Sequence, residues 1–121
     1  MSEVWAIVGS RDYNHHNELF QSMDSFIEQF GKPRRIVSGG AKGADSLAKH
    51  YAHVRDIPFQ EFEAEWSKHG PFAGPKRNQL IAKECDRMFA FSSLDELTPG
   101  TKDAVTQASG LKRWVWVNVY E

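Results

Sequence analysis

The feature that most constrains the fold is a glycine-rich turn between an apolar run and a helical segment. The turn reads Ser38-Gly39-Gly40-Ala41-Lys42-Gly43-Ala44-Asp45, and it follows the apolar run Arg35-Ile36-Val37. Glycine lets backbone N–H groups approach a ligand closely, and the N-terminus of a helix adds the positive end of its dipole. The turn therefore predicts an anion site, with a nucleotide phosphate as the expected ligand. The alternative is a tight connection without a ligand.

The turn matches neither of two common phosphate-binding motifs. It lacks the G-x-x-x-x-G-K-[ST] pattern of Walker-type NTPases and the G-x-G-x-x-G pattern of dinucleotide-binding domains. An anion site at this turn therefore needs support from the rest of the chain.

Apolar runs and helical segments alternate along the chain. The apolar runs cover residues 4–8, 35–38, 58–63, 87–91 and 113–119, and the helical spacing covers 17–30, 45–56, 75–85 and 101–109. This alternation predicts an α/β fold, in which a five-stranded parallel sheet has helices on both faces. A chain of 121 residues closes one core, so we expect a single domain over residues 1–121. The longest irregular stretch is expected at 64–74.

Ligands of open α/β sheets bind outside the carboxyl ends of the strands, where four turns of this chain should meet. The first turn carries Gly9, Ser10 and Arg11, and the arginine could clamp a phosphate or carboxylate. In the second, Lys42 offers a point charge for a phosphate. Asp45 is expected to cap the following helix, and a bond to a ribose hydroxyl is the alternative.

The other two turns precede the later helices. Pro75 suits a first helical position, which would put Lys76, Arg77 and Asn78 in the first turn. Cations there oppose the helix dipole, and a bound anion would remove that cost.

The fourth turn contains Gly100 and Thr101, which can present an N–H group and a hydroxyl at a helix N-terminus. Asp103 is expected to be a capping acid, with acid/base chemistry as the alternative.

Composition limits the partners and the compartment. The net charge of −1 provides no general field for a polyanion, so binding to nucleic acid is not expected. No stretch approaches the ~20 apolar residues of a membrane span and the N-terminus has no signal-like segment, so we expect a cytoplasmic protein. The single cysteine, Cys85, is expected to be a small buried hydrophobe. The five histidines lack metal-ligand spacing, so we expect no metal and no cofactor.

Two tryptophans share one face of the last predicted strand. Trp114 and Trp116 alternate with valines, as side chains on a strand do. We expect their rings to cover a helix or the end of the sheet. The alternative is an exposed patch that joins two copies in a homodimer.

Four motifs together resemble the YspA-like (YpsA-related) branch of the SLOG superfamily. They are Gly9-Ser10-Arg11, the turn from Ser38 to Asp45, Ala73-Gly74-Pro75-Lys76-Arg77-Asn78 and Pro99-Gly100-Thr101, in this order. The resemblance spans nearly the whole chain. It implies a Rossmann-like fold of three layers with strand order 3-2-1-4-5, and a pocket for a nucleotide or a nucleotide derivative. The dimers of SLOG relatives also favour a homodimer.

The same superfamily contains the DNA-processing protein A family and the Lonely guy phosphoribohydrolases, which cleave the N-glycosidic bond of nucleoside 5′-monophosphates. Lonely guy enzymes use an arginine and the glutamate of a Pro-Gly-Gly-x-Gly-Thr-x-x-Glu motif. Here the position three beyond Thr101 is Ala104, and Asp103 lies one residue earlier. One residue corresponds to about 100° of rotation on a helix, so the catalytic acid is not matched.

The leading hypothesis is therefore a module that senses or binds a nucleotide-derived ligand. The alternative is a phosphoribohydrolase, in which Arg77 stabilises the phosphate or the leaving group and Asp103 or Asp45 is the acid/base group. The discriminating feature is a carboxylate in the pocket beside Arg77. The predicted ligand-binding residues are Gly9, Ser10, Arg11, Ser38, Gly39, Gly40, Lys42, Gly43, Asp45, Gly74, Lys76, Arg77, Asn78, Gly100 and Thr101.

Overall fold

The sheet has five parallel strands in the order β3-β2-β1-β4-β5, as the resemblance implied. The computed structural model describes residues 2–40, 42–93 and 97–119, so Ala41 of the glycine-rich turn and Tyr120 lie outside the described residues. The strands are β1 (Val4–Gly9), β2 (Arg35–Gly39), β3 (Phe59–Phe62), β4 (Arg87–Ser92) and β5 (Trp114–Val119). Chain order reverses direction at β1, whose neighbours are β2 and β4.

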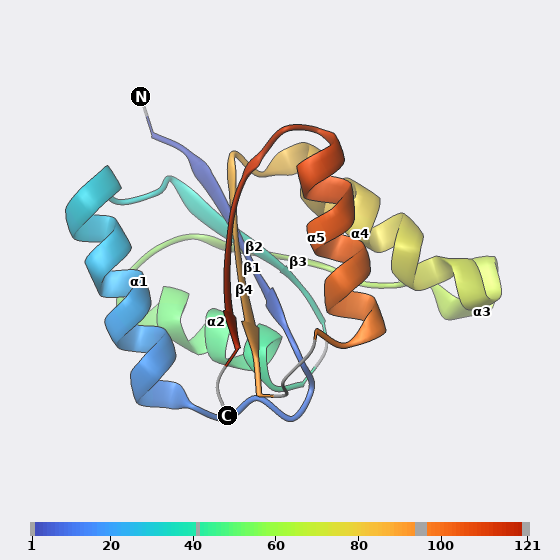
Figure 1. The fold of residues 1–121 in the computed structure, drawn as a ribbon, viewed down its shortest axis with the longest axis horizontal. Helices are drawn as coiled ribbons and strands as arrows, with labels where there is room; N and C mark the ends of the chain where they lie inside the picture. Colours follow the sequence, from blue (N-terminus) through green and yellow to red (C-terminus); the bar gives the residue numbers. More distant parts are fainter. Residues whose placement is uncertain (1, 41, 94–96, 120–121) are drawn as a thin grey trace.

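Helices cover both faces of this sheet, which gives three layers (Figure 1). The helices α1 (His16–Phe30) and α2 (Ala44–Val54) lie on one face. The helices α4 (Ala73–Glu84) and α5 (Pro99–Gly110) lie on the other, in contact with each other. The Rossmann-like expectation is confirmed.

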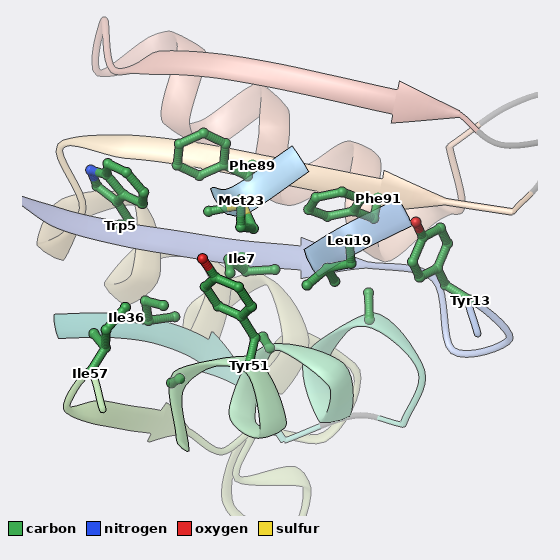
Figure 2. Close-up of a cluster of buried hydrophobic side chains, with 13 residues drawn as sticks. Trp5, Ile7, Tyr13, Leu19, Met23, Ile36, Tyr51, Ile57, Phe89 and Phe91 are labelled. Atoms are coloured by element: carbon green, nitrogen blue, oxygen red, sulfur yellow. The ribbon is translucent and has the colours of Figure 1, made fainter. Parts of the chain in front are cut away.

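Alternating side chains of the strands divide the core into two clusters. In β1, Trp5 and Ile7 point into a cluster with side chains of α1 and α2 (Figure 2). Their neighbours Ala6 and Val8 point to the opposite face, where Ile81 of α4 lies. A strand buried on both faces must be apolar throughout, which explains the continuous run Val4–Val8.

The predicted boundaries are wrong around α4. The helix begins at Ala73, so Pro75 is its third residue and not its first. Lys76, Arg77 and Asn78 follow in positions four to six, beyond the first three amides, and this weakens the argument that cations there oppose the dipole. The stretch 64–74 is not irregular either. It contains the short helix α3 (Trp66–His69) and a 3₁₀ turn (Gly70–Phe72).

Trp114 and Trp116 pack against aromatic rings of α1, as the favoured interpretation expected. The ring centroid of Phe26 lies 5.7 Å from that of Trp114 and 4.9 Å from that of Trp116. Trp114 remains 37% exposed at the edge strand β5. Only part of the surface of these rings is therefore available for contact with a second copy at this edge. The homodimer stays a prediction.

Cys85 is buried at the end of α4, as expected. Burial raises the pKa of its thiol to about 11. Within residues 2–40, 42–93 and 97–119, no helix has the length and apolar character that crossing a membrane requires.

Candidate functional site: a cavity at the carboxyl edge of the sheet

A cavity of about 640 Å³ lies where the predicted turns meet. Its walls come from the end of β1, the start of α2, the short helix α3, and the N-terminal parts of both α4 and α5. The volume is within the range of small-molecule sites, and the position is the crevice expected at a reversal of strand order. Ten of the predicted ligand-binding and catalytic residues line it: Gly9, Arg11, Gly39, Asp45, Gly74, Arg77, Asn78, Gly100, Thr101 and Asp103.

Close packing of protein segments accounts for two of the predicted ligand-binding glycines, Gly9 and Gly43. A Cβ on Gly9 would lie 2.0 Å from Phe91 O. Gly43 has φ +74°, and its Cβ would lie 2.3 Å from Ser10 O. Both positions need glycine whether or not a ligand binds.

Gly39 is different because its missing side chain makes room for Arg77. A Cβ on Gly39 would lie 2.4 Å from Arg77 Nη1 and 2.9 Å from Asp45 Oδ2. The guanidinium of Arg77 therefore lies over the end of β2, although the arginine belongs to α4. The bare backbone of Gly39 lets this cation reach the centre of the carboxyl edge.

The prediction that Asp45 caps α2 is wrong. The N-cap is Gly43, and the amide of Ala44 donates to Ser10 O at 3.2 Å. Asp45 is instead the second helical residue, and its Oδ1 lies 3.0 Å from the hydroxyl of Ser38. It is buried, and it is among the residues that line the cavity.

The prediction that Asp103 caps α5 is also wrong. It is the fifth residue of that helix, and its Oδ2 accepts hydrogen bonds from Asn78 Nδ2 and Gln107 Nε2, both at 3.0 Å. Asn78 Oδ1 in turn accepts a bond from Arg77 Nε at 2.9 Å. A chain of side chains thus joins Arg77 to Asp103 across the cavity wall, and a carboxylate does lie in the cavity that Arg77 lines.

The N-terminus of α5 forms another part of the wall. Thr98, Pro99, Gly100 and Thr101 all line the cavity. The amides of Gly100 and Thr101 are in the first turn, where no helical carbonyl precedes them, and among the described residues no side chain caps them. The positive end of a twelve-residue helix therefore lies at the cavity.

Asp12, which the sequence analysis did not select, lines the cavity beside Arg11. Ser93 Oγ donates to Asp12 Oδ1 at 2.9 Å, and the backbone amide of Ser93 donates to Ser10 Oγ at 3.2 Å. The hydroxyl of Ser93, followed by that of Ser10, lowers the pKa of Asp12 below its usual value. These contacts hold the turn after β1 against the end of β4.

Several predicted site residues lie outside this cavity. Ser10 and Ser38 are buried behind its wall, Gly43 is enclosed by the turn after β1, and Lys42 and Lys76 are exposed elsewhere. Gly40 lines a second, smaller hollow. The lining residues that the sequence analysis did not select are Val8, Asp12, Trp66, Pro75, Ile81, Thr98, Pro99 and Ala104.

Trp66 is the most informative of these missed residues, because this large aromatic residue is 55% exposed although it lines the cavity. The sequence did contain a signal for this residue, because Trp66 is an aromatic residue in the stretch 64–74, which ends at the predicted site residue Gly74. Within the described part of the chain, no three side chains gather as ligands for a metal ion.

A comparison with protein families matches the N-terminal half of the chain. A family model described as the YspA, cpYpsA-related SLOG family matches residues 5–69, which are 65 of the 121 residues. The matched part runs from β1 to α3 and includes the turns at Gly9 and Gly39. The cavity residues of α4 and α5 lie beyond it. A comparison with curated proteins found no match.

Among solved structures, the chain is similar to DNA processing protein A (DprA) from Streptococcus pneumoniae. The TM-score is 0.71 at 20% sequence identity, and the match covers 96% of this chain and 50% of that protein. The chain therefore spans about half the length of this relative. At such low identity the similarity shows only that the two proteins share a fold. The chemistry of the cavity must be argued from the residues of this chain.

Proposed function

We propose that the cavity of this chain, which belongs to the YspA, cpYpsA-related SLOG family, binds a nucleotide or a nucleotide-derived ligand. The chain would then act as a sensing or binding module. Membership of this family indicates a nucleotide-related module in general. The observation that supports a phosphate-bearing ligand is the meeting of Arg77 and the N-terminus of α5 in one cavity.

The phosphate would bind between Arg77 and the first turn of α5. Gly100 and Thr101 supply amides that lack helical partners, and the guanidinium of Arg77 supplies charge and two parallel donors. Arg77 is already oriented by its bond to Asn78, so little side-chain entropy is lost when it meets an anion. This position differs from the glycine-rich turn of the sequence-based prediction, where Gly43 is explained by packing.

The nucleoside would occupy the rest of the cavity. Val8, Ile81 and Ala104 supply apolar walls, and Trp66 supplies an aromatic face on which a base can stack. Asp12 and Asp45 supply acceptors for ribose hydroxyls. Two arginines and three carboxylates line the cavity, which favours a ligand with both anionic and hydroxyl groups over a bare polyanion.

Equilibrium dialysis tests this proposal. The protein is dialysed against AMP, GMP, CMP and UMP, with adenosine and inorganic phosphate as controls. At least one monophosphate should bind at least tenfold more tightly than either control, because nucleoside and phosphate contacts act together. Equal binding of adenosine and AMP would contradict the phosphate site, and retention of none of these compounds by folded protein would contradict the proposal.

The alternative function, cleavage of the N-glycosidic bond of a nucleoside 5′-monophosphate, is supported by one observation. Two amides donate to Asp103 Oδ2 and hold this carboxylate at the cavity wall. The carboxylate shares the cavity with Arg77. Release of free base from AMP, lost in Asp103→Asn, would make this function the leading one.

Binding to nucleic acid remains unexpected because the chain is nearly neutral. The structural relative is named for processing DNA, so this expectation has its own test. A gel-shift titration with single-stranded DNA at low salt should show no complex at micromolar protein concentration.

A further inference from the structure

A second hollow adjoins the proposed nucleotide cavity. It has a volume of about 200 Å³ and is lined by Arg11, Gly40, Glu63, Ala64, Trp66 and Arg77. Arg11, Trp66 and Arg77 also line the large cavity, so these three side chains form a shared wall. A single ligand could therefore extend past both arginines from one space into the other.

The charges of the second hollow are unevenly distributed. Arg11 and Arg77 belong to the shared wall, whereas Glu63 lines only the second hollow. Glu61 lies close by, because a Cβ on Gly40 would approach its Oε2 to 3.1 Å. An anionic group is therefore favoured at the shared wall and disfavoured deeper in the second hollow.

This charge distribution determines which chemical group of a ligand can lie in the second hollow, beyond a phosphate bound at the shared wall. A terminal phosphate placed beyond the arginines would meet the carboxylate of Glu63 and be repelled. A neutral group rich in hydroxyls would instead donate hydrogen bonds to it, and bonds to a charged acceptor are stronger than neutral ones. The small volume suits a group of sugar size.

We infer that the second hollow is a subsite for a neutral polyhydroxyl group esterified to the diphosphate of a nucleotide in the main cavity. The diphosphate would pass between Arg11 and Arg77, and Glu63 would accept hydrogen bonds from the sugar hydroxyls. The glycine at position 40 leaves this subsite open, since a larger side chain there would be directed at Glu61 and Glu63. The inference rests on the proposed function, because it assumes that the main cavity holds the nucleotide.

Titration calorimetry and dialysis with AMP, ADP, ADP-ribose, ADP-glucose and ATP test the inference. At least one sugar-bearing diphosphate should bind at least tenfold more tightly than ADP, and ATP should bind no more tightly than ADP. In Glu63→Gln, the advantage of that sugar ester should fall by at least fivefold and ATP should bind more tightly, while AMP binding should change by less than threefold.

Glu65→Gln is the matched control, because it removes the same charge two residues further along the chain from an exposed residue that lines neither hollow. It should keep the advantage of the sugar ester over ADP. Thermal unfolding of each variant confirms that it is folded.

The outcomes separate this inference from the proposed function. Equal binding of ADP and both sugar esters, with AMP still bound, would overturn the inference and leave the proposed function standing. Loss of the sugar preference in Glu65→Gln but not in Glu63→Gln would also overturn it. If no nucleotide bound to folded protein, the proposed function and the inference would both fall.

Discussion

Asn78 donates from Nδ2 to Asp103 Oδ2 at 3.0 Å and so connects α4 to α5 at the wall of the cavity. The same amide nitrogen lies 3.2 Å from Gly100 O, and Asn78 Oδ1 accepts a bond from Arg77 Nε. One nearly buried side chain therefore orients the cation and the carboxylate that the two hypotheses about function invoke. Predictions about either group depend on this contact.

Replacement of Arg77 should weaken nucleotide binding. Arg77→Ala removes a charge-assisted bond to phosphate, which should cost about 1.5–3 kcal/mol, or roughly 10- to 150-fold in Kd for the best-bound monophosphate. The control is Lys76→Ala, which removes the same charge from an exposed residue outside both hollows. Dialysis of both variants measures the difference, and equal Kd values would show that Arg77 does not contact the phosphate.

Hydrolysis of nucleoside monophosphates should be slow or absent. The reaction builds positive charge on the ribose and needs a carboxylate held beside it. Ala104 stands where Lonely guy enzymes have glutamate, and a misplacement of about 1 Å at Asp103 can lower a rate ~100-fold. Incubation with AMP and chromatography of the free adenine measure the rate. A turnover near 1 s⁻¹ or faster, abolished by Asp103→Asn, would refute this prediction.

Gly43→Ala should destabilise the fold. A side chain at φ +74° costs about 1–3 kcal/mol, and the new Cβ would also collide with Ser10 O. Gly110→Ala is the control, because Gly110 ends α5 and a Cβ there meets nothing within 4 Å. Urea unfolding should show the control changing by less than about 1 kcal/mol. Similar midpoints for wild type and Gly43→Ala would mean that the turn is not tightly packed.

The contact between α1 and α2 should make stability depend on pH. Arg55, followed by Tyr51, donates hydrogen bonds to Asp24 and holds the pKa of this carboxyl below its usual 3.8. A lowered folded-state pKa stabilises the fold above the unfolded value, and this contribution is lost as the pH falls through the folded-state pKa.

The free energy of unfolding should therefore be lower in Asp24→Asn than in wild type at pH 7, and the difference should shrink below pH 3.8. Glu28→Gln removes the same charge from an exposed position of α1 and should show a smaller effect. A gap between Asp24→Asn and wild type that is constant from pH 7 to pH 2.5 would argue against the ion pair.

Cys85 should react slowly with thiol reagents in the folded protein. Burial raises its pKa from 9.0 to about 11, so the thiolate fraction at pH 8 should be about 100-fold lower than for an unperturbed thiol. A disulfide-exchange reagent should label the native protein at least that much more slowly than the protein in urea. Equal rates in the two states would show that this end of α4 opens readily.

The sequence determined the order of the elements, because the patterns that specify strands and helices are local. Period-two and three-to-four-residue spacings depend on neighbours along the chain, so residues 4–8 and 87–91 matched β1 and β4 to within one residue. The predictions that Asp45 and Asp103 cap their helices were wrong for a related reason. Asp45 and Asp103 have the residue type of a cap, but where a helix begins also depends on contacts from distant segments, such as the bond from the amide of Ala44 to Ser10 O.

Only the tertiary structure decided which side chains share the cavity and what the glycines do. Arg77 and Gly39 are far apart in the chain, and their contact follows from the strand order and the docking of α4. Trp66 faces the cavity because α3 folds against the start of α4, in a stretch without a strong periodic pattern. The spacing of residues along the sequence determines which face of a single helix or strand each side chain occupies. Which two elements come into contact depends instead on the packing of the whole core.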